Sequence, residues 1–174
     1  TIEDIILSKD KRGISNLRSD LVNDYCNQAA KFVLENKGVV MISTGFYIAG
    51  AGASETDGPP GAIAIGNALD DLGCNVIYVS DKYTVKYLSE MKRDNAIIIE
   101  FPIEEDLPSQ KFAKKIKKEY EPKLIISIER CGFDKTSSYR NMHGIDFSDY
   151  NAKIDYLFTQ DINSIAIGDG GNEI

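Results

Sequence analysis

Two loops of the chain place carboxylates beside glycine and proline, residue types from which acid–base sites are often built. The stretch ETDGPPGA, residues 55–62, puts Glu55 and Asp57 directly before two consecutive prolines. The stretch GDGGNE, residues 168–173, places Asp169 among three glycines. Paired carboxylates in unlike environments can divide the work of a general base and a general acid. Glu55 and Asp57 are therefore both candidates for a catalytic role, and one or the other is predicted to act.

A third carboxylate follows the apolar run KLIISI, residues 123–128, where Glu129 and Arg130 stand side by side in sequence. An arginine can hold a carboxylate with two hydrogen bonds, while a neighbouring glutamate receives an amine or moves a proton. Glu129 is therefore predicted to be catalytic, and Arg130 is predicted to bind the carboxylate of an amino-acid substrate. The alternative is that the two residues only pair with surface neighbours.

The glycines of both loops are candidate anion-binding positions. Successive backbone N–H groups in a Gly-rich turn can cradle an anion, and so can the first turn of a helix. Proline suits that first turn, so Pro59 or Pro60 is predicted to start a helix, with a simple helix cap at Asp57 as the alternative. The predicted substrate contacts in these loops are Gly58, Gly61, Gly168, Asp169, Gly170 and Gly171.

Known cofactor motifs are weak or missing in the sequence. GAGASE, residues 50–55, has a glutamate where the third glycine of a dinucleotide fingerprint belongs, and no phosphate-binding GxxxxGK[ST] occurs. His and Cys residues do not cluster with the spacing of a zinc site. No cofactor is clearly implied, but a divalent metal on Asp57, Asp81 or Asp169 stays open, because oxygen-ligand sites leave little sequence trace.

The elements that must position these residues alternate along the chain, which predicts a three-layer, Rossmann-like α/β fold with a mainly parallel central sheet. Apolar runs predict strands at 39–44, 75–80, 96–101, 123–128 and 164–168. Apolar periodicity predicts helices at 13–36, 59–73, 82–93, 109–120 and 151–161. Because parallel strands end at one edge of the sheet, we expect the loops 44–61, 129–146 and 168–173 to form one pocket.

Length and charge restrict the classes of function. The 174 residues suit one domain, residues 1–174, and the net charge of −7 argues against a nucleic-acid partner. No apolar run is long enough to cross a bilayer, so no membrane partner is expected. Three widely spaced cysteines favour a reducing, cytoplasmic location. A small-molecule substrate is expected, and a homo-oligomer stays open.

Several stretches resemble the D-glutamate cyclase C-terminal domain family. They are STGF (43–46), ETDGPPGA (55–62), VSD (79–81), IER (128–130), NMHGIDFS (141–148) and IGDGGNEI (167–174). The resemblance implies an α/β fold and a lyase that interconverts D-glutamate and 5-oxo-D-proline plus water. Within these stretches, further substrate contacts are expected at Thr44, Gly45, Asn141 and Asn172.

The sequence also departs from the family's pattern. Arg140 stands where similar members carry tyrosine, and the family continues past IGDGGNEI with further helix and strand. We therefore expect a domain truncated at its C-terminal end, with a helix starting after the strand at 164–168. The alternative function is a protein that binds a small anion, phosphate or carboxylate, with other or no catalytic activity.

Overall fold

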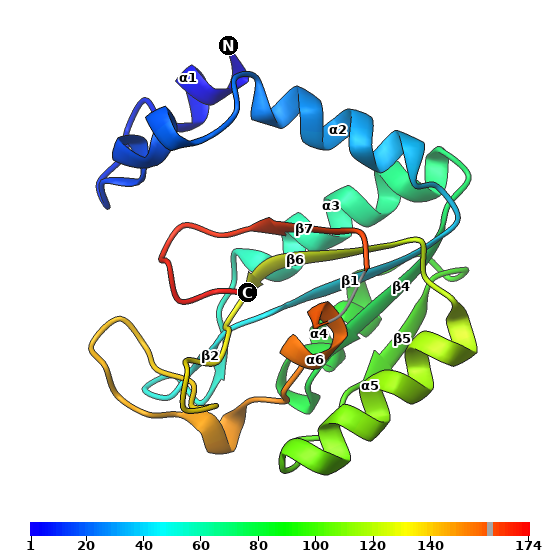
Figure 1. The fold of residues 1–174 in the computed structure, drawn as a ribbon. Helices are drawn as coiled ribbons and strands as arrows, with labels where there is room; N and C mark the ends of the chain where they lie inside the picture. The colour runs from blue at the N-terminus through cyan, green and yellow to red at the C-terminus, as the bar shows by residue number, and fades with distance from the viewer. Residues whose placement is uncertain (160–161) are drawn as a thin grey trace.

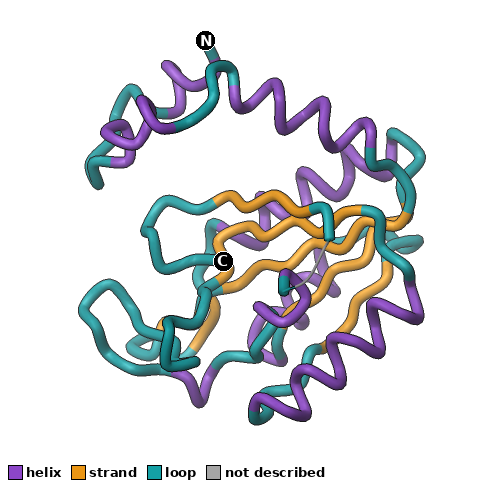
Figure 2. The backbone as a smooth tube through the Cα atoms, in the orientation of Figure 1, coloured by secondary structure: helices purple, strands orange, loops and turns teal. Residues whose placement is uncertain are grey.

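The structure is a computed structural model that describes residues 1–159 and 162–174. Its centre is a five-stranded sheet in the order β5-β4-β1-β6-β7, and every neighbouring pair is parallel (Figures 1 and 2). The strands are β1 (Val39–Gly45), β4 (Asn75–Ser80), β5 (Ile97–Glu100), β6 (Leu124–Arg130) and β7 (Ser164–Ile167). All five predicted strands are confirmed, with ends that differ by at most two residues.

Helices cover both faces of the sheet because successive strand side chains point to opposite sides. Val40 and Ile42 pack in one core beneath the first group of helices, whereas Met41 packs in a second core on the other face. The first group is α2 (Tyr25–Glu35), α3 (Gly58–Asp71) and α4 (Lys82–Met91); the second is α5 (Asp106–Tyr120) and α6 (Asp155–Phe158). The predicted three-layer α/β fold is confirmed.

The predicted helix at 13–36 is wrong in its first half. Its first half forms only a 3-10 helix, η1 (Ile14–Asp20), which follows a short helix, α1 (Ile2–Ile6), and Asp24 adopts a left-handed φ of 57° before α2 begins. Leu17 and Leu21 remain 54% and 48% exposed. An apolar face stabilises a helix only where it packs, and this part of the chain extends past the sheet (Figure 1).

Two other helix predictions change at their ends. Helix α3 begins at Gly58, one residue before the prolines, because the Asp57 side chain caps the Gly58 N–H at 2.8 Å. The predicted helix at 151–161 is reduced to α6, preceded by a 3-10 turn, η2 (Ser148–Tyr150). Residues 160 and 161 lie outside the described part. Within that part, no helix is long and apolar enough to cross a membrane.

The chain after β7 turns back instead of starting the expected helix. Residue Ile174 donates its N–H to the carbonyl of Arg130 at 2.9 Å, and Gly132 donates to the carbonyl of Asn172 at 2.9 Å. An added Cβ at Gly132 would lie 3.1 Å from the Glu173 backbone, so the glycine permits this close approach. The returning loop therefore lies against the end of β6 (Figure 1).

Candidate functional site

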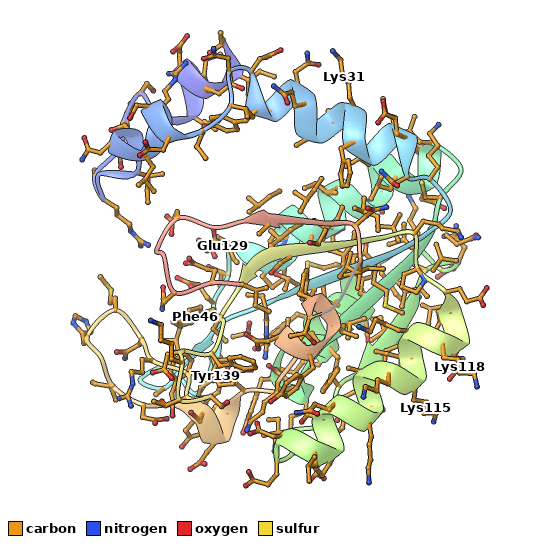
Figure 3. The ribbon with its side chains drawn as sticks, in the orientation of Figure 1. Lys31, Phe46, Lys115, Lys118, Glu129 and Tyr139 are labelled. Atoms are coloured by element: carbon orange, nitrogen blue, oxygen red, sulfur yellow. The ribbon has the colours of Figure 1, made fainter. Side chains whose placement is uncertain are left out.

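Three acidic side chains meet where the loop after β7 touches the end of β6. Oxygen atoms of Glu129, Asp169 and Glu173 all lie within 4.8 Å of one another. Glu129 is half-buried and lies beside the returning loop (Figure 3). We call these three residues, together with Glu55 and Asp57 of the loop before α3, the carboxylate cluster. The loop 168–173 therefore reaches the end of β6 as expected, and the loop 44–61 reaches it at Gly58, beside Glu129.

A bulge at the end of β6 directs Glu129 toward this cluster. Thr44 pairs with Ile128 and Gly45 pairs with Arg130, so Glu129 is an extra residue between two paired positions. Its φ of 45° is left-handed, as bulges often require of one residue. A Cβ at Gly58 would lie 2.9 Å from the Glu129 Cβ, so glycine there allows α3 to begin beside the bulge.

The cluster changes the protonation of its own members. Partial burial, then the charges of Asp169, Glu173, Asp57 and Glu55, raise the pKa of Glu129 to about 7. Both the protonated and the ionised form of Glu129 are therefore populated near neutral pH, whereas a glutamate with the ordinary pKa of 4.5 would be almost fully ionised.

The pKa of Glu55 is raised as well, first by burial and then by the charges of Asp57 and Asp169. The charge of Arg12 partly offsets this rise. The charge of Asp57 therefore contributes to the raised pKa of both other carboxylates predicted to be catalytic, Glu55 and Glu129. Their catalytic roles stay a prediction.

The raised pKa predicts a pH-dependent stability. Between pH 4.5 and about 7 the folded state keeps the Glu129 proton that the unfolded chain releases. This group therefore lowers the free energy of unfolding as pH rises through that window. Above pH 7, Glu129→Gln should be more stable than wild type by on the order of 1 kcal/mol, after solvent screening of a partly exposed group. Urea denaturation at pH 5 and pH 8 measures this, and an equal difference at both pH values would contradict it.

Arg130 does not face the cluster, and its predicted placement is wrong. The bulge turns the side chain inward, where it is 0% exposed. Its Nη1 lies 2.5 Å from Asp81 Oδ2 and 3.1 Å from the Gly45 carbonyl, and Nη2 lies 2.8 Å from the Ala152 carbonyl. The guanidinium therefore joins the ends of three chain segments inside the protein. Gly45 and Asp81 belong to this buried contact, so Asp81 is not free to hold a metal.

The anion cradle predicted at the start of α3 is occupied by the protein's own groups. The Gly58 N–H donates to Asp57, and Pro59 and Pro60 have no N–H. The next N–H, of Gly61, donates to the Asp57 carbonyl at 3.4 Å. The expected free donors at this helix start are therefore absent from the described structure, and the alternative reading of Asp57 as a cap is confirmed.

The second predicted cradle is filled by Glu173. The N–H groups of Gly170 and Gly171 donate to its two carboxylate oxygens at 3.0 and 2.7 Å. A Cβ at Gly168 would also lie 3.0 to 3.1 Å from Glu173 side-chain atoms. Sequence reasoning overlooked Glu173, although it is the second acid of GDGGNE and stands only four residues after Asp169.

Two of the remaining predicted contacts, Asn141 and Asn172, hold loops in place. The Asn141 carbonyl oxygen Oδ1 accepts the N–H groups of His143 and Ile145, and Asn172 donates to the Arg140 carbonyl at 3.0 Å. The Thr44 hydroxyl is buried beside Gly58 and has no hydrogen-bond partner among the described residues. Substrate contacts by these residues stay a prediction.

A small apolar cluster supports the loop after β6. It consists of Phe46, Cys131, Tyr139 and Phe147, and Figure 3 shows Phe46 and Tyr139 below Glu129 in this view. A cavity of about 640 Å³ lies beyond this support, lined by residues 103–105, 137–138, 146–151 and 153. Since no member of the carboxylate cluster lines this cavity, it is not the pocket expected from the three loops. In particular, the loop 129–146 contributes to it only through residues 137–138 and 146.

A family model described as D-glutamate cyclase-like, C-terminal, matches residues 2–174. The chain belongs to this family. The match confirms the resemblance noted in the sequence and includes the N-terminal segment as well as the carboxylate cluster. No curated protein matched the sequence.

Proposed function

We propose that the protein is a lyase that interconverts D-glutamate and 5-oxo-D-proline plus water. The observation that carries the proposal is Glu129, a half-buried carboxyl group whose pKa is raised to about 7, in a chain of the D-glutamate cyclase-like family. A group that titrates near the working pH transfers protons efficiently in both directions, which a reversible ring closure requires.

Ring closure requires two proton transfers from nitrogen to oxygen. The α-amine attacks the γ-carboxyl carbon, a C–N bond forms, and one carboxyl oxygen leaves as water. The ammonium loses two protons to become the ring N–H, and the departing oxygen gains two. We assign the first proton acceptor to ionised Glu129, which then returns that proton to the leaving oxygen. Glu55, whose pKa is also raised, is assigned to the second transfer.

The charge of the site favours this substrate over a simple anion. The carboxylate cluster attracts the ammonium group of an amino acid. Both predicted anion cradles are filled, one by Asp57 and one by Glu173, so phosphate would have to displace a carboxylate of the protein. The alternative of a small-anion-binding protein is therefore less well supported.

The three cysteines are unpaired, which suits a reducing compartment such as the cytoplasm.

The pH profile of the reaction tests the proposal. The ratio kcat/KM for D-glutamate should rise with pH to a plateau, with a midpoint at about 7, because only ionised Glu129 accepts the ammonium proton. The measurement is the initial rate of 5-oxo-D-proline formation between pH 5 and 8.5. A midpoint near 4.5, the ordinary value for glutamate, would show that Glu129 is not the titrating base.

A further inference from the structure

The proposed substrate raises an electrostatic problem that the carboxylate cluster alone does not solve. D-Glutamate carries two carboxylates, and the site holds five acidic side chains. Arg130, the cation expected from the sequence, is buried and occupied by Asp81. A substrate carboxylate brought beside the cluster therefore needs a different cation to offset the repulsion.

Arg12 is placed where such a cation is required. Its Nη1 lies 2.5 Å from Asp169 Oδ1, and the side chain is 51% exposed. Nη1 also lies 3.3 Å from the position of a Cβ at Gly170, so the guanidinium stands over the loop after β7. Among the described residues no hydrogen bond is found for its Nε or Nη2. The edge of the Arg12 guanidinium formed by Nε and Nη2 can therefore donate hydrogen bonds to a second carboxylate.

The turn that carries Arg12 is well ordered by its own hydrogen bonds. The Asp10 carboxylate accepts the N–H groups of Arg12, Gly13 and Ser15 at 2.8 to 2.9 Å, and the Ser15 hydroxyl at 2.6 Å. Gly13 has a left-handed φ of 80° that suits the turn. The N-terminal segment arches over β7 and presents this turn toward the loop that follows the strand (Figure 1).

We propose that Arg12 binds a carboxylate of the substrate, and that the substrate shares or replaces the present contact with Asp169. This inference rests on the proposed function. The N-terminal segment then has a defined role, because it brings a positive charge to this edge of the sheet. Substrate binding also ties residues 1–24 to the carboxylate cluster more firmly than one exposed ion pair does.

Kinetics of Arg12→Gln test the proposal, with Arg12→Lys as the conservative variant. Arg12→Gln should raise KM for D-glutamate about tenfold or more, while kcat changes less than about threefold, because the lost contact holds the substrate and does not move protons. Arg12→Lys should recover part of the loss. The matched control is Arg18→Gln, which removes an arginine of the same segment that pairs with Asp4, away from the cluster.

Calorimetric binding of D-glutamate to the same variants separates the two proposals. Turnover by wild type with equal KM in Arg12→Gln and Arg18→Gln would overturn the role of Arg12 and leave the proposed function intact. Binding that wild type shows and Arg12→Gln loses, without any turnover, would support Arg12 and overturn the proposed reaction. Absence of both binding and turnover in wild type would overturn both.

Discussion

Replacing Glu129 by glutamine is expected to lower kcat for D-glutamate by about a hundredfold or more, with KM changed less than about threefold. Glutamine keeps the shape of the side chain but cannot accept or return a proton. The same variant is expected to be more stable than wild type above pH 7, so lost activity cannot be attributed to unfolding. Steady-state kinetics at pH 7.5 measure both parameters.

A matched control for this variant is Glu100→Gln. Like Glu129, Glu100 lies at the carboxyl end of a parallel strand, β5, but it is exposed and lies outside the carboxylate cluster. Its replacement should leave kcat unchanged within about twofold, as expected of a surface carboxylate. Similar kcat values for Glu129→Gln and Glu100→Gln would remove Glu129 from the mechanism.

Replacing Arg130 by methionine is expected to lower the free energy of unfolding by about 3–5 kcal/mol. The change leaves Asp81, 2% exposed, as a buried charge without its partner, and it leaves the carbonyls of Gly45 and Ala152 without their donor. Urea denaturation measures the loss. If the single variant does not fold, Arg130→Met with Asp81→Asn should restore part of the stability, because the unpaired charge is then absent.

Replacing Arg93, an exposed arginine in ion pairs with two aspartates, is the control for the loss of stability expected of Arg130→Met. Arg93 is 40% exposed and contacts Asp70 and Asp71, so Arg93→Met should cost only about 0–1 kcal/mol. Equal small losses for Arg93→Met and Arg130→Met, together with a raised KM for the second, would instead support the substrate contact that the sequence suggested for Arg130.

The sheet could be predicted because each strand is a short run of apolar, β-branched residues, and such runs fit a sheet covered on both faces. The proximity of Glu129 and Asp169 could be predicted because parallel strands end at the same edge of the sheet. The inward turn of Arg130 could not be predicted. It depends on a one-residue bulge, which reverses the side of the sheet that the next residue faces. The residue types of IER, residues 128–130, do not indicate a bulge.

Two other differences have the same kind of cause. The apolar periodicity of residues 14–32 is real, but the sequence does not show that Leu17 and Leu21 stay about half exposed in the fold. The glycines of GDGGNE do form a cradle of N–H groups, but a sequence does not show that Glu173 folds back to fill it. Arg12 was overlooked because its contact with Asp169 joins opposite ends of the chain.

Proton NMR of the reaction approached from both sides tests the central claim most directly. Samples of the protein with D-glutamate and with 5-oxo-D-proline, at pH 7.5, should converge on the same ratio of the two compounds. Samples with the L-enantiomers and samples with Glu129→Gln serve as controls and should change at least about a hundredfold more slowly. No conversion of either D-compound by the wild-type protein would contradict the proposed function.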